Sequence, residues 1–158
     1  MRKFVSRIPI PTFLRMMRFW PPYWGAGIVV EHVADDLSEI RTSMTLRTTS
    51  TNYVGTHFGG NLYSMCDPWF MFMFLHRLGP EYIVWDKSAT IHFRRPGKGK
   101  VTAVFRLSHE DIESVRKELE STRKVTPTFV AEIRDENGEC VAEVEKVIYI
   151  RKKESKRA

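Results

Sequence analysis

Residues 59–78 read GGNLYSMCDPWFMFMFLHRL, and this stretch decides the fold. From Asn61 to Leu78 apolar side chains occupy nearly every helical face, whereas a helix on a protein surface shows one polar stripe. Gly79-Pro80 follows at the positions where helices commonly end. We therefore expect one helix over residues 61–78, bent at Pro68, that other elements of the fold enclose.

Segments with alternating apolar and polar residues flank this helix and predict strands of an antiparallel sheet. Turn residues at 35–36, 95–99 and 135–138 are expected to join neighbouring strands as hairpins, and residues 48–60 have loop chemistry. The expected strands cover residues 27–34, 38–47, 82–94, 100–107, 128–134 and 139–151. A sheet with one apolar face that curls around a single helix buries both at once, so the predicted fold class is α+β.

Two further helices are expected outside this core. Residues 12–20 form a short amphipathic helix that Pro21-Pro22 ends; it is either a lid on the body or a membrane-surface element. Ser108 and Asp111 form a capping-box-like start to a charged helix that runs to residue 123. Its single apolar stripe places that helix on the surface.

Size and composition indicate one domain over residues 1–158, with an amphipathic segment at 1–25 and a basic tail at 152–158 that is either a frayed end or a binding arm. Apolar residues make up 42% and no apolar run is long enough to span a bilayer, so we expect a cytoplasmic protein without integral membrane association. The net charge of +6 favours anionic partners in general. Cys66 and Cys140 lie in different elements, which disfavours a disulfide framework or a metal site.

The start of the central helix offers a place for chemistry. Gly59 and Gly60 leave backbone N–H groups free to point at a carbonyl oxygen, as in an oxyanion hole, although they are equally consistent with a tight helix entry. Asp67 lies two turns further on in apolar sequence, where desolvation should raise its pKa and ready it as a base or nucleophile. The alternative is that Asp67 caps the second half of a bent helix.

The spacing of Asn52, Gly55, Gly59 and Gly60, with Asp67 seven residues after Gly60, resembles the hot-dog superfamily. It is similar to acyl-CoA thioesterases of the phenylacetate-pathway type, whose motif runs Asn-x-x-Gly-x-x-His-Gly-Gly with an acidic residue seven positions on. The stretch Arg94-Arg95-Pro96-Gly97 looks like the Arg-Pro-Gly turn of that family. Two departures stand out: Phe58 occupies the histidine position, as in a branch with Phe-Gly-Gly, and the charged helix at 108–123 is additional.

The resemblance implies a hot-dog fold and hydrolysis of an acyl-CoA thioester without metal or redox cofactor, coenzyme A entering only as part of the substrate. Gly60 together with Gly59 would donate N–H to the thioester carbonyl, Asp67 would activate water or attack directly, and Asn52 would orient substrate or water. Such sites lie across a subunit boundary, with Asp67 from one chain and the double glycine from the other. The resemblance therefore implies a homo-oligomer, a dimer or a dimer of dimers.

Further substrate contacts are expected around the helix start and in the basic turn. Near the helix start they are His57, Phe58, Tyr63 and Ser64; in the turn they are Arg94, Arg95 and Lys98. The basic side chains could pair with the phosphates of a nucleotide, or the turn is simply solvated. His57 is alternatively a loop histidine with satisfied hydrogen bonds. The Met and Phe residues at 70–74 are core and also candidates for the wall of an acyl pocket.

Three other functions compete with hydrolysis. The first is non-catalytic binding of an acyl group or acyl-CoA, which needs the fold without the histidine. The second is nucleic-acid binding, which the positive charge favours but which lacks interleaved aromatic and basic residues on a strand face; no nucleic-acid partner is therefore expected. The third is a hydratase or dehydratase, for which a histidine paired with an acid is not evident.

Overall fold

The computed structural model of the chain describes residues 9–154. The first eight residues of the predicted amphipathic segment and residues 155–158 of the predicted basic tail lie outside the described part. Across residues 9–154 no helix is both long and apolar enough to cross a membrane.

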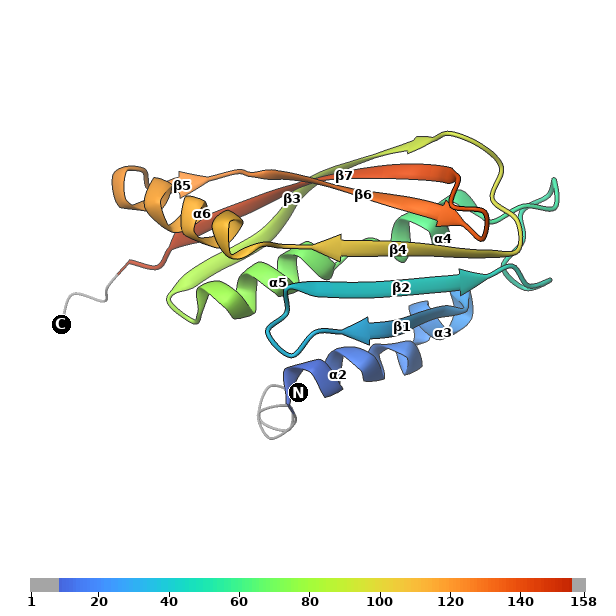
Figure 1. The fold of residues 1–158 in the computed structure, drawn as a ribbon, viewed down its shortest axis with the longest axis horizontal. Coiled ribbons are helices and arrows are strands. Elements are labelled where there is room, and N and C mark those ends of the chain that lie inside the picture. Colours follow the sequence, from blue (N-terminus) through green and yellow to red (C-terminus); the bar gives the residue numbers. More distant parts are fainter. Residues whose placement is uncertain (1–8, 155–158) are drawn as a thin grey trace.

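Antiparallel strands form one curved sheet, seven-stranded across the described residues (Figure 1). Along the sheet the order is β1-β2-β4-β6-β7-β3, and the short β5 pairs with β7. The strands are β1 (Ile28–Val33), β2 (Glu39–Thr45), β3 (Tyr82–Phe93), β4 (Lys100–Arg106), β5 (Lys124–Val125), β6 (Thr128–Asp135) and β7 (Cys140–Lys152). The ends of the other six strands lie within two residues of the predicted ones, whereas β5 was not predicted.

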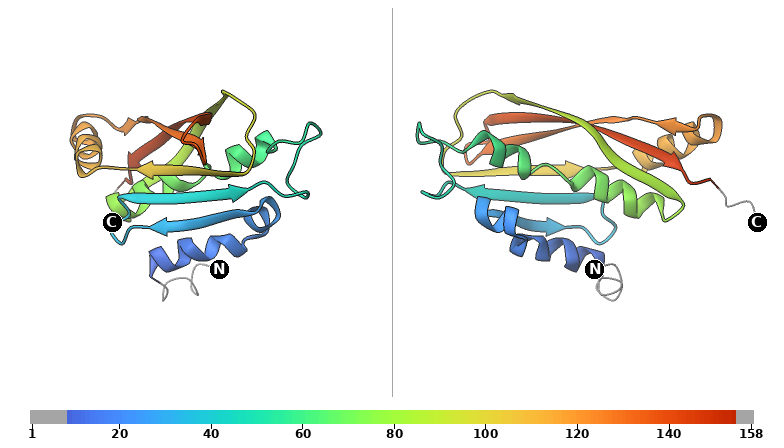
Figure 2. Two further views of the ribbon diagram at one scale, coloured as in Figure 1. Left: turned by 45° about the vertical axis from the view of Figure 1, so that its right-hand side comes forward. Right: turned by 180° about the vertical axis from the view of Figure 1, so that it is seen from behind.

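Helices occupy three places around the sheet (Figure 2). α4 (Gly59–Ser64) and α5 (Trp69–Leu78) lie along its concave side, and α6 (His109–Ser121) packs at one end of the molecule. α2 (Ile10–Met16), the 3-10 turn η1 (Met17–Phe19) and α3 (Pro21–Ala26) run beside the edge strand β1. α6 starts with the predicted capping box between Ser108 and Asp111 and buries one apolar stripe.

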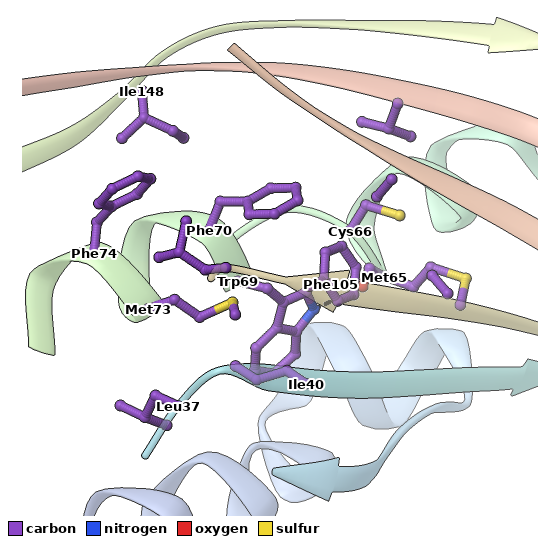
Figure 3. Close-up of a cluster of buried hydrophobic side chains, with 14 of the residues drawn as sticks. Leu37, Ile40, Met65, Cys66, Trp69, Phe70, Met73, Phe74, Phe105 and Ile148 are labelled. Atoms are coloured by element: carbon purple, nitrogen blue, oxygen red, sulfur yellow. Dashed lines mark hydrogen bonds between the residues drawn. The ribbon is translucent and has the colours of Figure 1, made fainter. Parts of the chain in front are cut away.

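The apolar helix is enclosed by the sheet, as the sequence predicts. Trp69, Phe70, Met73 and Phe74 are buried and meet residues from both halves of the sheet (Figure 3). The Phe70 ring centroid lies 5.5 Å from that of Phe105 on β4 and 5.1 Å from that of Phe129 on β6. This aromatic contact holds the two halves of the curved sheet against one helix.

The predicted continuous helix is wrong: α4 ends at Ser64 and α5 begins at Trp69. Pro68 has no N–H to donate to the carbonyl four residues earlier, and its ring disfavours helical geometry at Asp67. The Asp67 N–H instead reaches the Ser64 carbonyl, three residues back, at 3.3 Å. The chain is therefore interrupted over residues 65–68, rather than bent, and Asp67 lies in the interruption.

The predicted hairpin between residues 82–94 and 100–107 is also wrong, because β3 pairs with β7 whereas β4 pairs with β2 and β6. Two strands separate β3 from β4 in the sheet order, so the connection crosses three inter-strand spacings, about 14 Å. An extended chain of six residues spans about 20 Å, enough for residues 94–99 to cross. We call these residues the crossing loop. The hairpins at 35–36 and 135–138 are confirmed.

The first helix ends earlier than predicted, with α2 stopping at Met16 and η1 at Phe19, and Pro21-Pro22 begins a second helix, α3, which was not predicted. Prolines fit the first turn of a helix, where an N–H has no intrahelical acceptor. α3 buries Tyr23 and Ala26 against the body and ends at Gly27, whose φ of 76° suits glycine.

We expect Phe70→Ala to lower the free energy of unfolding by about 3–5 kcal/mol, because it removes a ring that contacts both halves of the sheet. Urea denaturation monitored by circular dichroism measures this loss. Val130→Ala, at an exposed position on β6, is the control and should cost less than about 1 kcal/mol. Equal losses in the two variants would contradict a core organised around α5.

Candidate functional site

A hollow of about 490 Å³ lies where the crossing loop passes the start of α4. Of the predicted site residues it brings together Asn52, His57, Gly59, Arg94 and Arg95. The rest of the lining is Val54, Thr56, Leu62, Phe93, Pro96 and Gly97. A second hollow, of about 540 Å³, lies between β4 and β6 and contains no predicted site residue.

Asn52 closes the loop that leads into α4. Its side-chain oxygen accepts hydrogen bonds from the N–H groups of Val54 and Thr56, at 3.1 and 3.0 Å. Its amide nitrogen donates to the Thr56 hydroxyl at 2.8 Å and to the His57 carbonyl at 3.3 Å. Asn52 therefore acts on the hollow by holding the loop that carries His57.

His57 is buried between this loop and the crossing loop. Its backbone N–H donates to the Gly97 carbonyl, and its Nε2 lies 3.0 Å from the Gly99 carbonyl. Burial lowers the pKa of His57, against a smaller opposite effect of the bond to Gly99. A neutral ring must donate from Nε2 to that carbonyl, which leaves a lone pair on Nδ1. Nδ1 is buried and has no partner among residues 9–154.

Because Gly59 and Gly60 have no side chains, two aromatic rings can pack against their backbone. A Cβ at Gly59 would lie 2.8 Å from the Phe93 ring, and one at Gly60 would lie 2.5 Å from the Phe58 ring. Within residues 9–154 no acceptor bonds the N–H of Gly59 or Gly60, as expected at the start of a helix. Phe58 is 54% exposed, so its ring can move from its place over Gly60 without disturbing the packing of the core.

The predicted basic turn lies at the rim of the hollow, with its arginines in exposed ion pairs. Arg94 pairs with Glu143 at 3.3 Å and Arg95 with Glu139 at 2.6 Å. Exposed pairs of this kind contribute little to stability and exchange readily for another anion. Lys98 is exposed on the same loop but does not line the hollow.

Asp67 does not line the hollow, and its surroundings are not the apolar ones expected from the sequence. Its side chain is 47% exposed, and its Oδ1 accepts hydrogen bonds from Tyr63 at 2.8 Å and from Lys146 at 3.0 Å. Burial and the Asp67 carboxylate raise the pKa of Tyr63, so the phenol keeps its proton and donates it. The interruption at Pro68 explains the difference, because it turns Asp67 out of the helix toward β7.

Lys146 is the site residue that sequence reasoning missed. It lies on β7 between the inward residues Val144 and Ile148, and its side chain is 1% exposed. Its Nζ also lies 3.3 Å from Asp86 Oδ1, a buried oxygen that accepts no hydrogen bond in the described chain. The contact with Asp86 is thus electrostatic. The signal in the sequence was a lysine at a position that the alternation of apolar and polar residues in this strand places on the inward face.

The buried charges of Lys146 and Asp86 shift each other's pKa. Burial alone would lower the pKa of Lys146, but the hydrogen bond to Asp67 and the charges of Asp67 and Asp86 raise it overall. Burial raises the pKa of Asp86 even though Lys146 opposes that shift. Lys146 is therefore an ammonium held between two carboxyl groups.

The other candidate nucleophiles are not activated. Ser64 donates to the Gly60 carbonyl at 2.8 Å within α4. Cys66 and Cys140 are free thiols, and burial raises the pKa of each. Among residues 9–154 no three His, Cys, Asp or Glu side chains are grouped so as to hold a metal ion.

Comparison with known proteins places the chain in a family. Residues 12–150 match the model of the domain of unknown function DUF4442, and the chain belongs to that family. No curated protein matches the chain in sequence.

Solved structures with the same architecture cover nearly the whole chain. A protein of unknown function from Pseudomonas aeruginosa, described as a probable thioesterase, superposes with a TM-score of 0.77 at 24% identity over 94% of this chain and 100% of its own. A thioesterase from Haemophilus influenzae has a TM-score of 0.67 at 13% identity, covering 97% and 98%. A mutant thioesterase from Pseudomonas aeruginosa gives 0.66 at 14%, covering 94% and 98%. These matches confirm the predicted hot-dog fold.

We expect Lys146→Met to lower the free energy of unfolding by about 2–3 kcal/mol near neutral pH, because it keeps the stem but leaves Asp86 without a cation. The half-exposed Asp67 keeps the loss below that of a fully buried pair. A carboxyl group whose pKa is raised by folding destabilises the fold above that pKa and ceases to do so below the unfolded value. The loss should therefore shrink as the pH falls toward about 4.

Urea denaturation of both proteins across this pH range measures the difference. Lys146→Met combined with Asp86→Asn is the matched control, because removing both charges should restore part of the stability. A loss that stays constant with pH would contradict the buried ion pair.

Proposed function

We propose that this protein hydrolyses an acyl-CoA thioester, with the hollow at the crossing loop as its active site. The observation that carries the proposal is the convergence on one hollow of a buried His57 Nδ1 and a Gly59 N–H group, both without a partner in the described chain, and the arginine rim; Gly60 follows Gly59 under the Phe58 ring. The thioesterase descriptions of proteins with the same fold support this choice of reaction. The phenylacetate-pathway type and a cytoplasmic location remain predictions.

In the proposed reaction Gly59 and Gly60 donate N–H to the thioester carbonyl oxygen. A water oxygen attacks the carbonyl carbon while Asp67 takes a proton from that water. The carbon–sulfur bond then breaks, and Asp67 gives the proton to the leaving thiolate. Direct attack by the Asp67 carboxylate is the alternative first step. Water is the only co-reactant, and coenzyme A takes part only as the leaving group.

Substrate binding follows from the rest of the lining. Arg94 and Arg95 would exchange their surface glutamates for phosphate oxygens, with Lys98 adding charge nearby. Leu62 and Phe93 offer apolar contact for the acyl group, next to Phe58. Tyr63 and Ser64 act indirectly: Tyr63 orients Asp67 and Ser64 stabilises the first turn of α4.

The site is proposed to need two chains. Along β3, Asp86 beside Asp67 and Phe93 at the hollow are seven residues, or about 23 Å, apart. β3 is an edge strand. Twofold antiparallel pairing of β3 with a second copy, centred between Ala89 and Thr90, sets Asp86 of one chain opposite Phe93 of the other. Asp67 of one chain would then face the hollow of its partner.

One observation favours the second candidate, non-catalytic binding of an acyl group or acyl-CoA. The Phe58 ring covers Gly60 at the position where the family motif has histidine. If the ring stays there, a carbonyl oxygen cannot approach the Gly60 N–H, and the hollow would bind without hydrolysing.

Asp67→Asn should lower kcat for hydrolysis by about 10²–10⁴, because the amide cannot accept the proton of the attacking water. Release of free thiol from short- and long-chain acyl-CoA measures the rate. The amide keeps an oxygen for Tyr63, and urea denaturation shows whether the variant is folded. Glu145→Gln, an exposed carboxylate beside Lys146 in sequence, is the control and should retain the wild-type rate. An unchanged rate in Asp67→Asn would remove the enzymatic assignment and leave acyl-CoA binding.

Mixing two inactive variants tests the two-chain site. Asp67→Asn lacks the base, and Gly59→Val fills the hollow where an added Cβ already meets Phe93. Refolded together in equal amounts, they should recover about a quarter of wild-type activity, since half of the dimers are mixed and each holds one intact site. Mixed dimers that form without recovery would place the whole site within one chain.

A further inference from the structure

The segment α2–η1–α3 is fixed along the edge of the sheet at β1 (Figure 1). Leu14 and Tyr23 are buried in the core, and the Arg15 side chain donates from Nη2 to the Val33 carbonyl of β1 at 2.8 Å. The Tyr23 ring lies 5.9 Å from that of Trp69 in α5. The segment is therefore a docked part of the fold, and its outward side chains are held in a defined place.

The outward side of this segment is apolar. Phe19 is 70% exposed, Trp20 50% and Trp24 72%, and Met16 lies beside them, also about half exposed. We call these four residues the N-terminal apolar face. Single exposed apolar residues are common, but four large ones within nine positions form a patch that marks a contact with another surface.

The charge around this face has one sign. The Arg18 guanidinium lies 5.5 Å from the Phe19 ring centroid, and Arg18 and Arg47 line a hollow of about 240 Å³ together with Phe19 and Trp24. Residues 9–30 contain two basic side chains, Arg15 and Arg18, and no acidic one. Glu31, the first acid in the chain, is paired with Lys100 at 2.5 Å.

This pattern selects among possible partners. In a twofold contact between two copies the same patch meets itself, so arginines would face arginines with no acid to neutralise them. A membrane surface fits better: Trp and Phe favour the boundary between headgroups and acyl chains, while arginine reaches the phosphates. Anionic lipid adds attraction for each basic residue near the surface.

We propose that the N-terminal apolar face docks on an anionic lipid surface, with Phe19, Trp20 and Trp24 entering the headgroup boundary and Arg18 and Arg47 meeting lipid phosphates. Neither α2, with seven residues, nor α3, with six, can cross a bilayer, so the contact is peripheral. It does not depend on the proposed hydrolase activity, because none of these residues lines the hollow at the crossing loop.

The test uses the full chain and sedimentation with two kinds of vesicle, phosphatidylcholine alone and phosphatidylcholine mixed with phosphatidylglycerol. Binding is expected to the mixed vesicles and to weaken with added salt. Phe19→Ser with Trp24→Ser should weaken it at least about tenfold, and Arg18→Gln with Arg47→Gln should remove most of the salt dependence. Tyr53→Ser, a fully exposed aromatic in the loop before α4, is the matched control and should bind as the wild type does.

Fluorescence identifies which residue enters the lipid. Tryptophan emission should shift to shorter wavelength with mixed vesicles, and Trp24→Phe should reduce that shift while binding persists. Failure of the wild type to bind mixed vesicles at low salt, or equal binding by the Phe19→Ser/Trp24→Ser variant, would overturn the proposal. So would light scattering that shows this variant to be a smaller oligomer than the wild type, because a second copy would then cover the face. Thiol release from soluble acyl-CoA should stay unchanged in every variant of this face.

Discussion

The buried ammonium of Lys146 is the constraint on which the arrangement of this fold depends. It joins the interruption of the central helix, at Asp67, to the sheet at Asp86, and its side chain is almost wholly removed from water. Leaving that charge unpaired would cost a large share of the stability of a domain of this size, so both carboxyl groups stay close to it. Asp67, β3 and β7 are thereby fixed relative to one another.

The central helix divides, where Asp67 pairs with Lys146, into two parts with different roles. Enclosure by the sheet comes from Trp69, Phe70 and Phe74, which lie after the interruption, whereas the candidate chemistry lies before it and within it. Pro68 breaks the hydrogen-bond ladder, and the break lets Asp67 reach Lys146 instead of continuing along the helix. The first part of the helix, α4, is then free to present Gly59 to the crossing loop.

The sequence could predict what depends on local pattern. The apolar faces of residues 61–78, the Ser108–Asp111 capping box and the turn at 135–138 each carry their own signal, and the structure has all three. The pairing of β3 with β7 carries no such signal, because strands distant in sequence choose partners through the whole sheet. Lys146 was missed for a related reason: a lysine in a strand is usually solvated, and only Asp67 and Asp86, brought near by the fold, make burial tolerable. Of the residues that line the hollow, Asn52, His57, Gly59, Arg94 and Arg95 were predicted, whereas Phe93 at the end of β3 was not, because its approach to Gly59 depends on the pairing of β3 in the sheet.

In the described part of the chain the two edge strands of the sheet differ: β1 is covered by other elements, and β3 is not. At β1 the α2–η1–α3 segment covers the strand, and Arg15 takes up the Val33 carbonyl, so that edge cannot pair with another sheet. At β3 no segment of the described chain covers the outer side of the strand. All twelve residues of β3, which include Asp86 and Phe93, therefore lie at an open edge of the sheet. Because β1 and β3 end opposite sides of the strand order, a lipid surface met through Phe19 and Trp24 leaves β3 open. Membrane docking and assembly with a second copy can thus proceed at once, since they draw on separate edges of one sheet.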